Sequence, residues 1–172
     1  MPEQWIAVSD IPADGREYTF DDQTLWREGC EAYSLAVKPG RDLVAKATIM
    51  PQSDGGILVR GTLTGSVVMP CDRCAGSYEV EIDEQYDLFE QLPEGETGEA
   101  PRVREVSGEL QLDIGALLWE EFALSLPVKP LCSEECKGVC PGCGKDLNTE
   151  SCECSGDEGD ERLAVFRNLK IK

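Results

Sequence analysis

Residues 131–154, LCSEECKGVCPGCGKDLNTESCEC, decide the fold of this 172-residue chain. Six of its nine cysteines fall within this stretch. The first ten residues, MPEQWIAVSD, contain neither the basic nor the apolar region of a secretory signal, so we expect a cytoplasmic protein. Because thiols stay reduced in the cytoplasm, we interpret the cysteines as metal ligands rather than disulfide partners.

Two further thiols, Cys71 and Cys74, form a C-x2-C pair upstream of that stretch. Apolar residues occupy alternate positions in residues 57–69, and the alternation resumes in residues 78–82. This pattern predicts two antiparallel strands that carry the cysteine pair at the tip of their hairpin. A tight turn of this kind points two sulfurs at one metal ion, as in a zinc knuckle.

The remaining patterns predict more strands and two helices. Short strands are expected in residues 5–7, 16–20 and 33–37, and a longer one in residues 43–50. One helix is expected in residues 21–32, capped by Asp21 or Asp22. A second begins at Asp113 and carries an apolar face made of Ile114, Leu117, Leu118 and Phe122.

These elements predict an α+β fold. We expect a mostly antiparallel β-meander covered by one or two helices, followed by a Cys-rich zinc-knuckle segment. The chain divides into a body, residues 1–130, a zinc-binding segment, residues 131–154, and a C-terminal part, residues 155–172. That last part is predicted to be an acidic spacer with a basic terminal helix. No apolar run reaches the roughly 20 residues needed to cross a bilayer, so no membrane contact is expected.

The sequence alone allows two groupings of the eight thiols. Zinc in structural sites takes four thiolate or imidazole ligands, and the chain contains no histidine. The favoured grouping uses all eight cysteines in two sites: Cys71, Cys74, Cys132 and Cys136, and separately Cys140, Cys143, Cys152 and Cys154. The competing grouping joins Cys132, Cys136, Cys140 and Cys143 and leaves two pairs over. The ninth cysteine, Cys30, is expected to be a buried core thiol.

Zinc is the favoured metal, with two structural ions expected. Neither ferredoxin spacing occurs, and Cys152-Glu153-Cys154 does not match the C-x2-C-G turns of a rubredoxin-like iron site. A thiol oxidoreductase that uses Cys71 and Cys74 is disfavoured, because the pair lies on a hairpin rather than at the start of a helix. With no histidine and no open metal position, catalysis finds little support.

Charge limits the choice of partners. The formal net charge of −18 argues against tight, unassisted binding to nucleic acid, which depends on cations that neutralise phosphates. The last eleven residues reverse this balance, with four cations and no acid. We therefore expect the acidic body to bind a basic partner. A weak RNA contact is assigned to Arg162, Arg167, Lys170 and Lys172.

Several segments together resemble the bacterial YceD family, named for accumulation of large-subunit ribosomal RNA. They are the hairpin CDRC, the helix that follows it, LPVKPLC, EECKGVCPGCGKDLN and the terminal LAVFRNLK. The resemblance runs from about Leu43 to the C-terminus and is most specific in residues 126–148. Some family members carry only the first cysteine pair and a His/Cys pair after the LPxxP segment. This correspondence supports the grouping of Cys71, Cys74, Cys132 and Cys136.

The resemblance implies a cytoplasmic, non-enzymatic factor in the synthesis, processing or stability of ribosomal RNA. Its partner is expected to be a basic ribosomal protein or an RNA-processing factor. The alternative is a zinc-ribbon module that mediates protein interactions unrelated to ribosomes.

Overall fold

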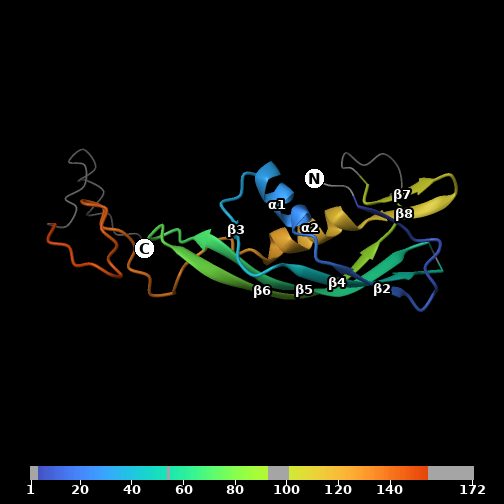
Figure 1. Ribbon diagram of the computed structural model, residues 1–172, viewed down its shortest axis with the longest axis horizontal. Helices are drawn as coiled ribbons and strands as arrows, with labels where there is room; N and C mark the ends of the chain where they lie inside the picture. The colour runs from blue at the N-terminus through green and yellow to red at the C-terminus, as the bar shows by residue number, and fades with distance from the viewer. Residues whose placement is uncertain (1–3, 54, 93–100, 155–172) are drawn as a thin grey trace, which may run out of the picture.

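A computed structural model describes residues 4–53, 55–92 and 101–154. It contains two antiparallel sheets and two helices, as the α+β prediction requires (Figure 1). The predicted terminal helix and its basic tip lie outside the described residues. Within the described ranges, no helix has the length and apolar character needed to cross a membrane.

The larger sheet has five strands. Their bounds are β2 (Arg16–Phe20), β3 (Lys38–Pro39), β4 (Val44–Pro51), β5 (Ile57–Pro70) and β6 (Ser77–Glu90). Strands β4, β5 and β6 form the predicted meander, with β2 beside β4 and β3 beside the far end of β5. The hairpin of β5 and β6 stays paired over its whole length, from Ile57↔Glu90 to Pro70↔Ser77. It therefore extends beyond the rest of the sheet and carries the first cysteine pair away from the helices (Figure 1).

A glycine on β5 makes room for an aromatic side chain on β6. Gly61 faces Tyr86 across the hairpin, and the hydroxyl of Tyr86 donates a hydrogen bond to the carbonyl of Lys46, 3.0 Å away. A Cβ at position 61 would lie 1.9 Å from that carbonyl oxygen. The glycine is therefore required by a close approach of backbone and ring.

Two helices cover one face of the sheet (Figure 1). Helix α1 (Gln23–Ala32) begins after Asp22, whose carboxylate accepts the Thr24 N–H at 2.9 Å. Helix α2 (Ile114–Ser125) begins after Asp113, whose carboxylate accepts the Ala116 N–H at 3.1 Å. The predicted apolar face of α2 is confirmed as core: Ile114, Leu117, Leu118 and Phe122 are fully buried. α1 packs on α2 where Gly29 meets the ring of Trp119.

The strand predicted in residues 33–37 is wrong. Tyr33 ends α1 and stacks on Trp119, with ring centroids 5.5 Å apart. Ser34 then adopts a positive φ of 52°, which reverses the chain, and only Lys38 and Pro39 pair with β5. Aromatic stacking and the turn therefore override the alternation of apolar residues. Cys30 is half-buried and packs against the core rather than lying fully inside it.

A smaller sheet was not anticipated in full. Strands β7 (Val103–Val106) and β8 (Glu109–Asp113) form a hairpin around Ser107 and Gly108, and β1 (Trp5–Ala7) pairs with β8. Arg104 lies over the ring of Trp5, 3.6 Å from its centroid. This sheet joins the N-terminal residues to the start of α2.

Candidate metal centres

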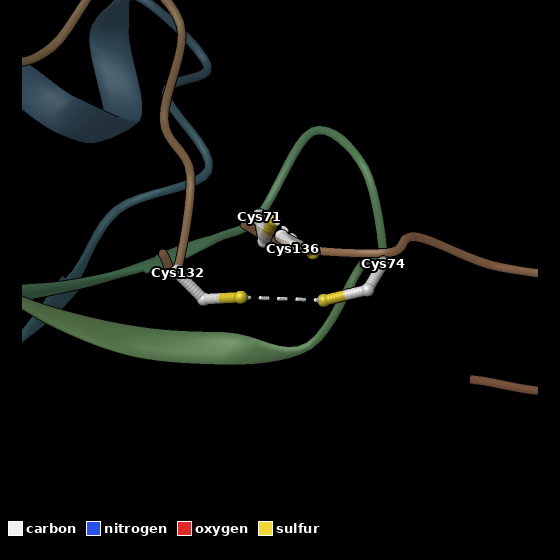
Figure 2. A group of neighbouring side chains, drawn as sticks. All are labelled: Cys71, Cys74, Cys132 and Cys136. Atoms are coloured by element: carbon white, nitrogen blue, oxygen red, sulfur yellow. Dashed lines mark hydrogen bonds between the residues drawn. The ribbon is translucent and has the colours of Figure 1, made fainter. Parts of the chain in front are cut away.

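Eight of the nine cysteines gather in two groups of four, as the favoured grouping predicts. The ligand atoms in each group lie within 4.8 Å of one another. The first group joins Cys71 and Cys74, from the tip of the β5–β6 hairpin, to Cys132 and Cys136, from the segment after α2; Figure 2 shows these four side chains converging. The second group consists of Cys140, Cys143, Cys152 and Cys154.

The spacing of the sulfurs fits a tetrahedral metal ion. Zinc–sulfur bonds of about 2.3 Å place the four sulfurs of a tetrahedron about 3.8 Å apart. In the first group, the sulfurs of Cys71 and Cys136 are 3.8 Å apart and those of Cys74 and Cys132 are 3.7 Å apart. In the second group, the sulfurs of Cys143 and Cys152 are 3.6 Å apart, and that of Cys152 is 3.2 Å from that of Cys140. All nine cysteines are free, so no disulfide accounts for this proximity.

Both groups begin with the same backbone turn. The Cys71 N–H donates to the Gly76 carbonyl at 2.9 Å, and the Ala75 N–H donates to the Cys71 carbonyl at 2.8 Å. In the second group, the Cys140 N–H donates to the Lys145 carbonyl and the Gly144 N–H donates to the Cys140 carbonyl, both at 2.8 Å. The residue after the second cysteine has a positive φ in each turn, 56° at Ala75 and 74° at Gly144. The two C-x2-C pairs are therefore two copies of one backbone turn, despite their different sequences.

Asp72 and Arg73, at the tip of the β5–β6 hairpin, form hydrogen bonds with the segment that follows α2. The Asp72 N–H donates to the Pro130 carbonyl at 2.9 Å. The guanidinium of Arg73 donates to the carbonyls of Glu134 and Cys136, at 3.0 and 3.1 Å, and the Arg73 carbonyl accepts the Val139 N–H at 3.2 Å. Cys132 and Cys136 are thus held opposite Cys71 and Cys74 without any disulfide.

Hydrogen bonds also favour thiolates at defined positions. Backbone N–H groups, first that of Cys132, lower the pKa of the Cys71 thiol to about 6. The pKa of the Cys140 thiol is also lowered to about 6, first by the contact with Cys152 and then by the backbone N–H groups of Cys143 and Gly142. Contact with a neighbouring sulfur has the opposite effect at two other positions. The sulfur of Cys136 raises the pKa of the Cys132 thiol to about 12, and the sulfur of Cys152 raises the pKa of the Cys154 thiol to about 12. Four sulfurs this close cannot all ionise without a counter-charge, and a divalent cation supplies one.

Arg73 and Asn148 were not identified from the sequence. Arg73 lies inside the C-x2-C pair, a position that the motif leaves unspecified. The amide of Asn148 donates to the Cys136 sulfur at 3.4 Å, and its oxygen accepts the Lys137 N–H at 2.8 Å. Asn148 is the last residue of CGKDLN, and nothing in its position in the sequence predicts contact with the first group.

Parts of this chain are similar to curated proteins of bacteria and plants. An uncharacterized protein of Mycobacterium tuberculosis is 32% identical over 99 residues, which are 55% of this chain and 47% of that protein. The chloroplastic YCED homolog 1 of Arabidopsis thaliana, a large ribosomal RNA subunit accumulation protein, is 30% identical over 60 residues, 35% of this chain and 19% of its own. The chain therefore spans less than half the length of these relatives. No solved structure matches it.

A family model described as large ribosomal RNA subunit accumulation protein YceD matches residues 59–170, a range that contains all eight clustered cysteines. Because this match covers more than half of the chain, the protein belongs to the YceD family.

Proposed function

We propose that this protein is a non-enzymatic zinc-binding factor that supports the synthesis, processing or stability of large-subunit ribosomal RNA by binding a basic ribosomal or RNA-processing partner. The observation that carries this proposal is the near-tetrahedral spacing of the sulfurs of Cys71, Cys74, Cys132 and Cys136. The family description supports the link to ribosomal RNA.

Each cysteine group would hold one zinc ion in a structural role. Cysteine fills all four positions of each tetrahedron, so no position remains for water or substrate. The first ion would close a loop of the chain from Cys71 to Cys136 and fix the hairpin tip to the segment after α2. The second would shape residues 140–154, whose one β-bridge in the described part of the chain pairs Asp146 with Val139, just before this segment. Small segments of this kind depend on their metal for folding.

The charge of the β5–β6 hairpin supports a basic partner. Glu79, Glu81, Asp83 and Asp87 lie at alternate positions of β6, and all four are exposed. Arg41 pairs with Glu81 and Arg60 pairs with Asp87, while Asp83 forms no ion pair among the described residues. This row is a surface for cationic side chains, and screening by salt would weaken such an interaction.

A pull-down from bacterial lysate at low and at high salt tests the proposal. The expected result is salt-sensitive enrichment of basic ribosomal proteins or of precursor large-subunit RNA on the wild-type chain. The variant Glu81→Lys with Asp83→Lys should lose this enrichment. Asp14→Lys with Glu28→Lys makes the same change in net charge at exposed acids away from β6 and should retain it.

The results also separate the two functional classes. Enrichment of a partner without ribosomal proteins or precursor RNA would favour the protein-interaction module unrelated to ribosomes. Equal loss in both double variants would contradict a defined acidic surface on β6. Truncation after residue 161 removes Arg162, Arg167, Lys170 and Lys172 and tests whether they contact RNA. If they do, the truncated chain should pull down less RNA and the same amount of partner protein.

A further inference from the structure

A cavity of about 490 Å³ lies between the two helices, the chain after α1 and strand β5, and its lining contains none of the eight clustered cysteines. This volume is within the range of small-molecule sites, which is roughly 300–1,000 Å³. Its inner wall is apolar and includes Trp26, Leu43, Val67 and Phe122, all buried. Nothing in the proposed role of the zinc sites uses this cavity.

The walls of the cavity are fixed by side-chain hydrogen bonds. The amide of Gln23 donates to the Leu43 carbonyl at 2.9 Å and accepts the Leu43 N–H at 3.0 Å, so α1 is tied to the start of β4. The hydroxyl of Ser66, which is fully buried, accepts the Arg41 N–H at 2.7 Å. A cavity held open in this way is formed before any ligand enters, which lowers the cost of binding.

One polar group at the cavity lacks a partner. The indole Nε1–H of Trp26 is the single buried side-chain nitrogen or oxygen without a hydrogen bond in the described part of the chain, and Trp26 is only 3% exposed. Buried donors are almost always satisfied by protein, by water or by a ligand. The nitrogen itself has almost no accessible surface, so it does not open onto the cavity that Trp26 lines. Trp26 is therefore a reporter of what enters the cavity rather than a polar contact for it.

The charge of the lining is opposite to that of the whole protein. Arg27, Lys38 and Arg41 line the cavity, against the single acid Glu31, in a chain of net charge −18. Arg41 pairs with Glu81, whereas neither Arg27 nor Lys38 forms an ion pair within the described ranges. Arg27 is close enough to Asp22 to help lower the pKa of that carboxyl, after the hydrogen bonds from Thr24. Two cations thus remain available at the edge of an apolar cavity.

From the volume, the apolar wall and the cations at its edge, we propose that the cavity binds a free, small anionic amphiphile. Its apolar body fills the space between Trp26, Val67 and Phe122. The negative charge lies near Arg27 and Lys38. The C-terminal residues 162–172 of the same chain carry four cations and no acid, so their charge does not suit this site.

The test uses decanoate as the probe and the full-length, zinc-loaded chain. In a ¹⁵N–¹H correlation spectrum, the indole N–H signal of Trp26 is identified by its absence in Trp26→Phe. Decanoate should shift that signal with one-site saturation and leave the indole signals of Trp5 and Trp119 much less affected. Decyltrimethylammonium, which has the same alkyl chain and the opposite charge, should not shift it.

Three variants separate binding in the cavity from unspecific adsorption. Arg27→Gln with Lys38→Gln should weaken decanoate binding at least about fivefold. Arg60→Gln with Arg104→Gln removes two cations elsewhere and should leave it unchanged. Val37→Trp fills the cavity from a partly exposed position and should abolish binding while zinc content and melting temperature stay near wild type.

Three results would overturn the proposal. The first is an unmoved Trp26 signal up to the solubility limit of decanoate. The second is an equal shift with the cationic amphiphile, which would point instead to an apolar groove for a partner's side chains. The third is an equal loss of affinity in the two double variants.

Discussion

Asn148, in the loop of the second cysteine group, donates its side-chain amide to the sulfur of Cys136 in the first group, at a distance of 3.4 Å. Its amide is also 2.6 Å from the Asp146 carboxylate, and its oxygen accepts the Lys137 N–H at 2.8 Å. Amide hydrogen bonds to a metal-bound sulfur orient the ligand and disperse its charge. The two groups are therefore joined through one residue and not only through the chain between them.

We expect Asn148→Ala to destabilise the first site although it removes no ligand. The loss of the bond to Cys136 should cost about 1 kcal/mol and speed the release of zinc to a chelator. Asn148→Asp should be worse, because it replaces the donor by a negative charge beside a thiolate. Release is measured with a colorimetric chelator. Thr149→Ala is the matched control, and equal release rates in the two alanine variants would contradict a specific role for Asn148.

Metal content should identify the two sites separately. Elemental analysis of the wild-type chain is expected to give two zinc ions, and Cys71→Ser and Cys140→Ser should each remove one. The structural consequences should differ. Cys71→Ser releases the segment after α2 from the hairpin and should lower the free energy of unfolding by about 3 kcal/mol or more.

The second variant provides the contrast, because Cys140→Ser disrupts residues 140–154 and reaches the first site only through Asn148, so it should lower the melting temperature of the α+β body much less than Cys71→Ser does. An unaltered zinc count in Cys71→Ser would mean that the hairpin and the segment after α2 share no ion. A finding of iron in place of zinc would contradict the choice of metal but not the grouping.

Sequence reasoning succeeded where a residue type has few structural roles. Asp113 caps α2 as predicted, and the closely spaced cysteines converge in fours, which is the arrangement expected of metal-binding thiols. It failed at residues 33–37, where the stacking of Tyr33 on Trp119 decides the path of the chain. Contacts such as Asn148 with Cys136 also escaped it, because they depend on how two loops meet and leave no periodic signal.

The shared knuckle turn predicts a stabilising substitution. Ala75 has a φ of 56°, in the left-handed region that glycine adopts at Gly144 in the equivalent turn. Ala75→Gly should relieve this strain and stabilise the protein by about 0.5–1 kcal/mol, since part of the gain is lost to greater freedom of the unfolded chain. Gly144→Ala should destabilise the second turn. Chemical unfolding measures the effect of Ala75→Gly, and the rate of zinc release measures that of Gly144→Ala. If Ala75→Gly destabilises the protein, the two turns are not equivalent.

Gly61 offers a steric test of the sheet. An alanine Cβ there would lie 1.9 Å from the Lys46 carbonyl oxygen and 2.5 Å from the Tyr86 hydroxyl. Because the oxygen belongs to the backbone of the neighbouring strand, the sheet must distort, and Gly61→Ala should cost about 2–3 kcal/mol by urea unfolding. Gly55→Ala places its methyl in open space at a φ of 84° and should cost only about 1 kcal/mol. Similar losses at both positions would show that β4 and β6 do not constrain position 61.

Tyr86 should make the protein sensitive to alkaline pH. Burial, with a smaller effect of the negative charge of Glu121, raises the pKa of its hydroxyl from 10 to about 12. Between these two values the unfolded chain loses the proton and the folded chain keeps it, so stability is complete below pH 10 and falls as the pH rises towards 12. Tyr86→Phe loses the hydrogen bond to Lys46 at every pH but should show a shallower decline. Urea unfolding at several pH values from 9 to 11.5 measures the slope. Tyr33→Phe is the control, because Tyr33 is 59% exposed. Parallel slopes for wild type and Tyr86→Phe would exclude Tyr86 as the titrating group.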